Sequence, residues 1–310
     1  MKKIYLILLL IIANSFSYSY YTPYSFLRFN SSGRASALAG CFVSMPNDAS
    51  AMFFNPATIS TVQNKRFTAT FLKHVLDINS GNIAYIHSFE DIGTFSGAIL
   101  YTNYGSFEGA DEYGNKTNTF SANDLAIQAQ YSNKLDTNLY YGVGIKFIFS
   151  NIEKATSTAF ALDAGLIYLM PEIRTNIGIS ILNVGAQLST FDGTTEDLPI
   201  DVRMGINHRL RGLPLLVNLS FHSLADRTDS FFDKFLNFSI AGEFYFGDHV
   251  QLRLGYDNKI RRMTTPENER KLSGFSAGLG IKSDILNFDY GLAQMGNSSL
   301  LHRFTIGLDF

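Results

Sequence analysis

Apolar residues recur at every second position along most of this chain, from about residue 66 to its last residue. That period is typical of a β-strand, in which successive side chains point to opposite faces. In the final segment, RFTIGLDF, the apolar side chains fall on one face and small or polar residues separate them. Counting such segments predicts about fourteen strands of roughly ten residues, the length that a tilted membrane-spanning strand requires. The expected strands begin near residues 66, 82, 93, 121, 138, 156, 175, 199, 213, 235, 250, 272, 285 and 302.

The connections between these expected strands alternate in length. Tight joins are expected at 211–212, 247–248 and 283–284. Long loops at one end and short turns at the other are typical of outer-membrane barrels, whose strand number is even. In lipid the last strand must also pair with the first, because an open edge would leave backbone groups unsatisfied. The pattern therefore predicts an all-β fold, a closed transmembrane antiparallel barrel over residues 63–310, with long loops at 106–120, 185–198, 225–234, 258–271 and 293–301.

A soluble β-sandwich is the alternative fold, since its strands also alternate. The exposed face of a sandwich would carry Lys and Glu on every strand. Here one face is almost uninterrupted Leu, Ile, Val, Phe and Tyr, and the other is rich in Gly, Ser, Asn and Gln with scattered charges. Charged residues make up only 17% of the chain, while aromatic residues reach 14%. These proportions favour a barrel with an apolar outside and a narrow hydrophilic lumen.

The first residues have the features of a secretory signal peptide. Lys2 and Lys3 form a positive start, the run from Ile4 to Ala13 is apolar, and serines at positions 15, 17 and 19 offer cleavage points. The apolar run is shorter than the roughly 20 residues that a membrane-spanning helix needs. We therefore expect residues 1–19 to be a signal peptide for export through the Sec pathway, and the mature chain to lie in the outer membrane of a Gram-negative bacterium.

Residues 20–62 do not alternate, and they precede the first expected strand. They are rich in small residues, which a segment inside a narrow lumen requires, and Asn55-Pro56 would end any regular element before the barrel begins. A disordered leader is the alternative, but apolar residues such as Phe42 and Phe54 argue against it. We expect an N-terminal plug in which Arg34, Asn55 and Pro56 have structural roles.

The chain offers few candidates for catalysis or metal binding. A net charge of −2 argues against a nucleic-acid partner, which normally requires a basic face. The six histidines lack the spacing of metal ligands, and no arrangement of Ser, His and Asp stands out. Cys41 is the only cysteine, so it forms no intrachain disulfide, and we expect a small buried thiol. The sequence therefore predicts no enzymatic activity and no cofactor or metal.

Charged residues gather in two of the expected long loops. Asp111 and Glu112 lie in one, and Arg261, Arg262 and Glu267 belong to a cluster in another. The simplest interpretation of the cluster is a solvated outer loop. The alternative is a docking surface for a partner protein or for anionic surface polysaccharide, and these five residues are its candidates.

Short motifs follow one another in a fixed order along the mature chain. Near its start are RASALAG at 34–40, DAS at 48–50 and FNPA at 54–57. Their order and spacing resemble the PorV/PorQ family of FadL-like barrels. The motifs that follow are more similar to the PorQ branch of that family; they are DIGTF at 91–95, NYGSF at 103–107, ADEYG at 110–114, NVGAQL at 183–188, LP at 198–199, LRLGY at 252–256 and GFSAG at 274–278.

The resemblance implies a fourteen-stranded barrel with an N-terminal plug, and a place in the type IX protein secretion system. PorQ-like barrels anchor the complex that attaches exported cargo to the cell surface, so the implied partners are PorZ-, PorU- and PorV-like components, besides outer-membrane lipids. The alternative function is that of a FadL-like channel for small hydrophobic molecules. The two differ in what a deletion would remove, because loss of an anchor abolishes cargo display and loss of a channel abolishes solute uptake.

Overall fold

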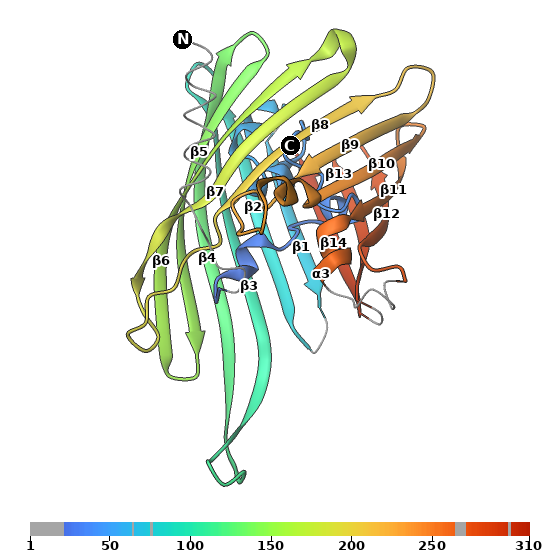
Figure 1. Ribbon diagram of the computed structural model, residues 1–310. Coiled ribbons are helices and arrows are strands. Elements are labelled where there is room, and N and C mark those ends of the chain that lie inside the picture. Colours follow the sequence, from blue (N-terminus) through green and yellow to red (C-terminus); the bar gives the residue numbers. More distant parts are fainter. Residues whose placement is uncertain (1–21, 64, 75–76, 264–270, 297–298) are drawn as a thin grey trace.

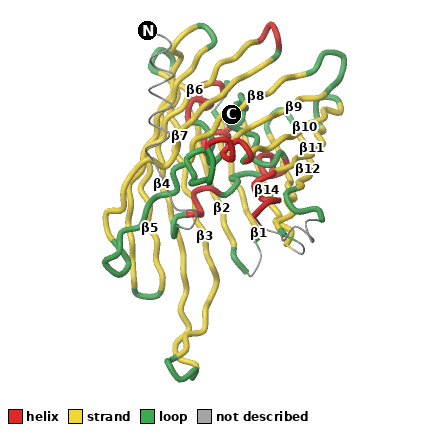
Figure 2. Tube along the Cα trace, in the orientation of Figure 1, coloured by secondary structure: helices red, strands yellow, loops and turns green. Residues whose placement is uncertain are grey.

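The computed structural model describes residues 22–63, 65–74, 77–263, 271–296 and 299–310. Fourteen antiparallel strands close into one barrel, in which each strand pairs with its neighbours in the sequence and β14 pairs with β1 (Figures 1 and 2). The predicted fold class is therefore confirmed. The expected signal peptide lies outside the described residues. The strands are β1 (Arg66–Lys73), β2 (Asn79–Phe89), β3 (Gly93–Ala110), β4 (Lys116–Asp136), β5 (Leu139–Ile152), β6 (Ala155–Met170), β7 (Thr175–Ser189), β8 (Asp201–Arg209), β9 (Leu215–Phe221), β10 (Phe238–Phe246), β11 (Val250–Asp257), β12 (Phe275–Lys282), β13 (Leu286–Met295) and β14 (Ser299–Asp309).

The seam between the first and last strands holds the end of the chain in place. Arg66 of β1 stands opposite Asp309 of β14, and their side chains form an ion pair inside the lumen. Beyond the seam, the backbone N–H of Phe310 donates to the carbonyl of Lys65 at 2.9 Å. The last residue is thus held by a backbone hydrogen bond to the residue that precedes β1.

The two faces of the barrel wall differ as the alternation predicts. Outward side chains are apolar and exposed, and inward side chains are polar and buried. Lipid favours the first face, and a lumen filled with polypeptide allows the second, provided that buried polar groups find partners. Outward examples are Ile83, Ile99, Val143, Ile145, Ile177, Ile206, Leu254, Phe304 and Ile306; inward examples are Asn82, Gln128, Lys146, Asp163, Ser180, Asn207, Glu243, Arg253 and Arg303.

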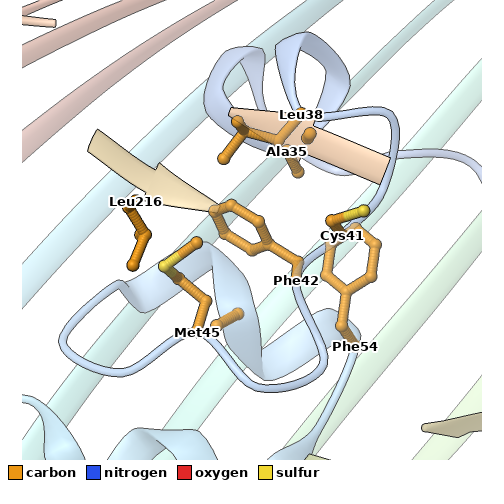
Figure 3. Close-up of a cluster of buried hydrophobic side chains, with 9 residues drawn as sticks. Ala35, Leu38, Cys41, Phe42, Met45, Phe54 and Leu216 are labelled. Atoms are coloured by element: carbon orange, nitrogen blue, oxygen red, sulfur yellow. The ribbon is translucent and has the colours of Figure 1, made fainter. Parts of the chain in front are cut away.

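Residues 22–62, here called the plug, fill the lumen. They form the short helices η1 (Ser25–Arg28), α2 (Gly33–Ala37), η2 (Ala49–Phe53) and η3 (Pro56–Thr61), drawn inside the barrel in Figure 2. Side chains of Ser32, Asp48 and Asn55 cap the last three by accepting backbone N–H groups. The plug has an apolar core of its own, in which the rings of Phe42 and Phe54 lie 5.4 Å apart (Figure 3).

The two ends of the barrel differ in their connections. The end that holds the first residues of β1 has short turns, and the opposite, long-loop end carries η5 (Phe231–Leu236) and α3 (Asn258–Met263). A further short helix, η4 (Pro171–Ile173), lies in a turn at the first end. Within the described residues, no helix has the length and apolar character to cross a membrane.

The longest strands form a hairpin that extends beyond the other loops. β3 has 18 residues and β4 has 21, and Figure 1 shows their joined ends projecting furthest from the barrel. The expected long loop at 106–120 is therefore wrong, because all but about five of its residues are strand. Ser106 and Phe107 of the NYGSF segment and Ala110 of the ADEYG segment pair with residues of β4 between 116 and 121, despite two register shifts, at Asn103/Ser106 and Glu108/Ala110. We call residues 104–121 the arm.

Candidate functional site

Arg34 joins the plug to the barrel wall. It lies in the first turn of α2, and its guanidinium donates to both carboxylate oxygens of Glu243 on β10, at 3.0 and 2.6 Å. It also donates to Asp48 of the plug at 2.9 Å. Burial alone would lower the pKa of Arg34, but Glu243 and Asp48 outweigh that effect and raise the pKa above its usual value. A bidentate pair of this kind fixes orientation as well as charge.

The network continues along the wall. Arg253 of β11 donates to Glu243 at 2.7 Å and to Asp289 of β13 at 2.5 Å. The side chain of Glu243 is 0% exposed, and its charge is balanced by the two arginines while the hydroxyl of Tyr245 donates to it at 2.7 Å. The network borders a polar cavity of about 290 Å³ near the short-turn end, which Arg209 and Lys282 also line.

Asn55 and Pro56 attach the C-terminal part of the plug to the barrel wall. The Asn55 side chain accepts from the N–H of Ala57 and donates to two carbonyls at 2.9 Å, that of Val43 in the plug and that of Leu166 on β6. Pro56 is the first residue of η3, where its missing N–H costs nothing. The plug approaches the wall so closely here that an added methyl group at Gly142 would overlap the backbone of Pro56.

Wall side chains also donate to plug carbonyls, and sequence reasoning missed these contacts. Asn82 donates to the carbonyl of Ser31 at 2.7 Å, Asn207 to that of Ser44 at 2.8 Å, and Ser180 to that of Phe54 at 2.6 Å. A plug with little regular structure has many backbone groups without internal partners, and burial makes each of them costly unless it is bonded. Further donors are Gln130, Ser132, Ser276 and Arg303.

A second cavity of about 610 Å³ lies at the long-loop end of the plug. Apolar residues of the plug, α3 and β14 line it together with several charged side chains. Most of those charges are paired, since Arg28 and Lys259 both bond Asp226 at 2.7 Å. The lining includes Phe29, Arg203, His222, Asp257, Ile260, Met263, Met295, Leu301 and Arg303.

Asp111 and Glu112 lie together at the tip of the arm. One carboxylate oxygen of Asp111 accepts the N–H groups of Tyr113 and Asn115, and the other accepts the Asn115 side chain at 2.9 Å. These bonds, first that of the Asn115 side chain, hold the pKa of Asp111 below its usual range. Asp111 thus shapes the tip, whereas Glu112 is exposed and forms no ion pair with any described residue.

Arg261 and Arg262 lie on α3, in the connection between β11 and β12. Arg261 is half-buried and donates to the carbonyl of Lys271 at 3.0 Å, and Arg262 is exposed. Glu267 lies outside the described residues. The structure therefore places the two pairs of candidate docking residues at the same end of the barrel but on separate elements. Within the described part of the chain, no group of three or more His, Cys, Asp or Glu side chains could hold a metal ion.

The fold is similar to that of solved hydrocarbon transporters. The toluene transporter TbuX of Ralstonia pickettii superposes with a TM-score of 0.60 at 13% identity, covering 91% of this chain and 99% of that chain. A FadL homologue of Pseudomonas aeruginosa gives 0.57 at 12% identity, covering 90% and 98%. The toluene transporter TodX of Pseudomonas putida gives 0.58 at 12% identity, covering 94% and 97%. At these identities the likeness concerns the fold.

A search among curated proteins found no significant match. A protein-family comparison did, because the family model of the type IX secretion system protein PorV matches residues 17–210, more than half of the chain. That span runs from before the plug, through the arm, to the end of β8. The chain therefore belongs to the PorV family of type IX secretion system proteins and is an outer-membrane β-barrel.

Proposed function

We propose that this protein is a non-enzymatic anchor of the type IX secretion system, which holds the cargo-attachment complex at the cell surface as PorQ-like barrels do. The observation that carries the proposal is the filled lumen. Buried ion pairs and hydrogen bonds from several wall strands, among them β2, β6 and β10, hold the plug inside the barrel. The arm, by contrast, presents exposed backbone and side chains at the long-loop end, which faces outward in outer-membrane barrels.

The partners in this proposal are PorZ-, PorU- and PorV-like components, with outer-membrane lipids around the barrel and surface polysaccharide as a further ligand. Export through the Sec pathway, with cleavage near residue 19, is part of the same proposal, and sequencing the N-terminus of the mature protein tests it. The barrel itself needs no catalytic group or cofactor for this role, because an anchor acts by binding alone.

The test is recovery of partners from the native membrane. A tagged protein should be crosslinked, purified and analysed by mass spectrometry for other type IX components. Replacing Asp111 and Glu112 with Ser in one variant, and Arg261 and Arg262 with Ser in another, would locate the docking element. Asp248→Ser, in a turn at the opposite end, is the matched control. Purification without any type IX component, even after crosslinking, would refute the anchor.

A channel for small hydrophobic molecules is the second candidate. It is favoured by the cavity of about 610 Å³ at the long-loop end, and by the solved structures of similar fold, which include toluene transporters. A channel predicts that deletion of the protein abolishes uptake of a small hydrocarbon while exported cargo remains on the surface. The anchor predicts the opposite pair of results.

A further inference from the structure

The cavity of about 610 Å³ at the long-loop end, here called the outer cavity, is lined by a buried cation that forms no ion pair with any described carboxylate. Arg303 of β14 is 4% exposed and lines the cavity of about 610 Å³. Its guanidinium donates to two plug atoms, the carbonyl of Asn30 at 3.1 Å and the hydroxyl of Ser36 at 2.8 Å. Among the residues that the structure describes, it forms no ion pair. Both of its partners are neutral dipoles, so its full charge remains.

Other basic side chains around the cavity differ from Arg303, because each has a carboxylate partner. Arg203 lies 2.6 Å from Asp201, and the imidazole of His222 lies 3.3 Å from Asp257. The half-buried Glu196 also lines the cavity and has no ion pair in the described part of the chain, but it lies more than 4.0 Å from any guanidinium nitrogen. Arg303 therefore lines this cavity as a buried guanidinium without a carboxylate within 4.0 Å among the described residues.

A neighbouring side chain responds to the charge of Arg303. His74 follows β1, the strand that pairs with β14, and its ring lies 4.9 Å from that of Phe29. Burial, together with the charge of Arg303, lowers the pKa of His74 to about 4. The imidazole is therefore neutral at physiological pH, and its buried Nε2 atom has no hydrogen-bond partner within the described structure.

The remainder of the cavity wall is suited to an apolar body. Phe29, Leu301 and Met295 lie on the plug and on the last two strands, and Ile260 and Met263 come from α3. A volume of about 610 Å³ falls within the range of pockets that enclose a small organic ligand. A buried unpaired charge is costly in such surroundings, and an oxyanion beside Arg303 would remove that cost.

We propose that this cavity binds a compact organic anion, with its carboxylate or phosphate group on Arg303 and its apolar body against Phe29, Met295 and Leu301. The ligand class differs from the neutral hydrocarbons named for the solved relatives, because a neutral ligand would leave the charge of Arg303 unbalanced. The site does not depend on the anchoring function, since a barrel can bind such a ligand whether or not it also holds partners.

The test compares charged and neutral probes of the same shape. The chain has no tryptophan, so Met263→Trp, at the exposed rim of the cavity, supplies a single fluorescent reporter in the detergent-solubilised barrel. The probes are phenylbutyrate, phenyl phosphate and the neutral phenylbutanol. An anion that accepts a charged hydrogen bond should bind about ten- to a hundredfold more tightly than the neutral probe. Tighter binding of either anion identifies which oxyanion the site prefers.

In the reporter background, Arg303→Met should abolish the preference for anions and leave phenylbutanol binding unchanged, whereas Arg303→Lys should retain part of the preference. Arg211→Met, at an exposed arginine in the connection between β8 and β9 at the other end of the barrel, is the matched control and should change nothing. Ser36→Ala removes a plug contact without removing the charge, so it should keep the preference. Equal binding of charged and neutral probes would overturn the proposal, and so would no binding of any probe at millimolar concentration. Neither result affects the test of the anchor, which measures the recovery of partner proteins.

Discussion

Replacing Arg34 with Met should loosen the plug while leaving the barrel closed. The substitution keeps a long apolar side chain beside Phe42 but removes the guanidinium that Glu243 and Asp48 share. Glu243, at 0% exposure, would then keep Arg253 as its one cationic partner, besides the hydroxyl of Tyr245. No strand of the wall is altered, so the loss falls on the state in which the plug is seated.

The magnitude follows from the geometry of the pair. Removing one partner of a buried ion pair costs about 3–5 kcal/mol. The cost is lower for Arg34, because its side chain keeps 16% exposure and Arg253 still compensates the charge of Glu243. We therefore expect Arg34→Met to destabilise the seated plug by about 2–3 kcal/mol. This cost corresponds to a roughly 30- to 150-fold rise in the population with a displaced plug.

Cys41 makes this population measurable. It is the only thiol in the chain and lies 1% exposed in the plug core beside Phe42 (Figure 3). Burial raises its pKa, so a maleimide reagent should react only when the plug opens. When reclosing is fast, the labelling rate follows the open population. Arg34→Met should therefore speed Cys41 labelling roughly 30- to 150-fold. Arg262→Met, at an exposed arginine on α3, should leave the labelling rate unchanged.

A rescue experiment completes this test. Combining Arg34→Met with Glu243→Leu removes both charges, and replacing a buried pair with apolar residues is often nearly neutral. The double variant should therefore label more slowly than Arg34→Met alone, while Arg253 retains Asp289 as its partner. If Arg34→Met labels within threefold of the unmodified protein, the ion pair does not hold the plug and the reasoning fails.

Two further predictions concern the wall and the arm. Gly142→Ala should raise the Cys41 labelling rate, because the new methyl group would overlap Pro56, whereas Gly307→Ala, with only ordinary contacts around it, should leave the rate unchanged. At the arm, the lowered pKa of Asp111 means that its bonds stabilise the tip fully above the usual Asp range and are lost as the pH falls through the lower folded value. The protection factor of the Asn115 amide, which corrects the exchange rate for its intrinsic pH dependence, should accordingly fall only in acid; a protection factor near one already at neutral pH would contradict this.

The barrel was predictable because one repeated physical constraint acts on every strand. Lipid on one side and a packed lumen on the other force an alternation that a single sequence displays, and the number of segments gave the number of strands. Strand ends were less predictable. Residues 106–120 are polar and contain glycines, which indicated a loop, but cross-strand pairing such as the stacked rings of Phe107 and Phe120 continues the hairpin.

The contacts of the plug were only partly predictable. Arg34, Asn55 and Pro56 were named from motifs and turn chemistry, but their wall partners lie far away in the sequence, as Glu243 does from Arg34. An inward polar residue on a strand signals that something polar faces it, without saying what. Arg303 is the clearest case, since an alternating pattern marks it as inward, and only the closed barrel shows that it forms no ion pair with the carboxylates of the described residues.

The two candidate functions require different behaviour of the plug: a channel must open it, and an anchor need not. The segment around α2 distinguishes the two functions. Residues just after α2, Ala39 and Gly40, line the outer cavity, whereas Arg34 near its start lines the cavity at the short-turn end. A solute that moved from one cavity to the other would have to displace this segment and break the bonds of Arg34. An anchor has no such requirement. Arg34→Met should therefore increase passage of a small solute if the barrel is a channel, and partner recovery should stay unchanged if the barrel is an anchor, because the arm and α3 are untouched.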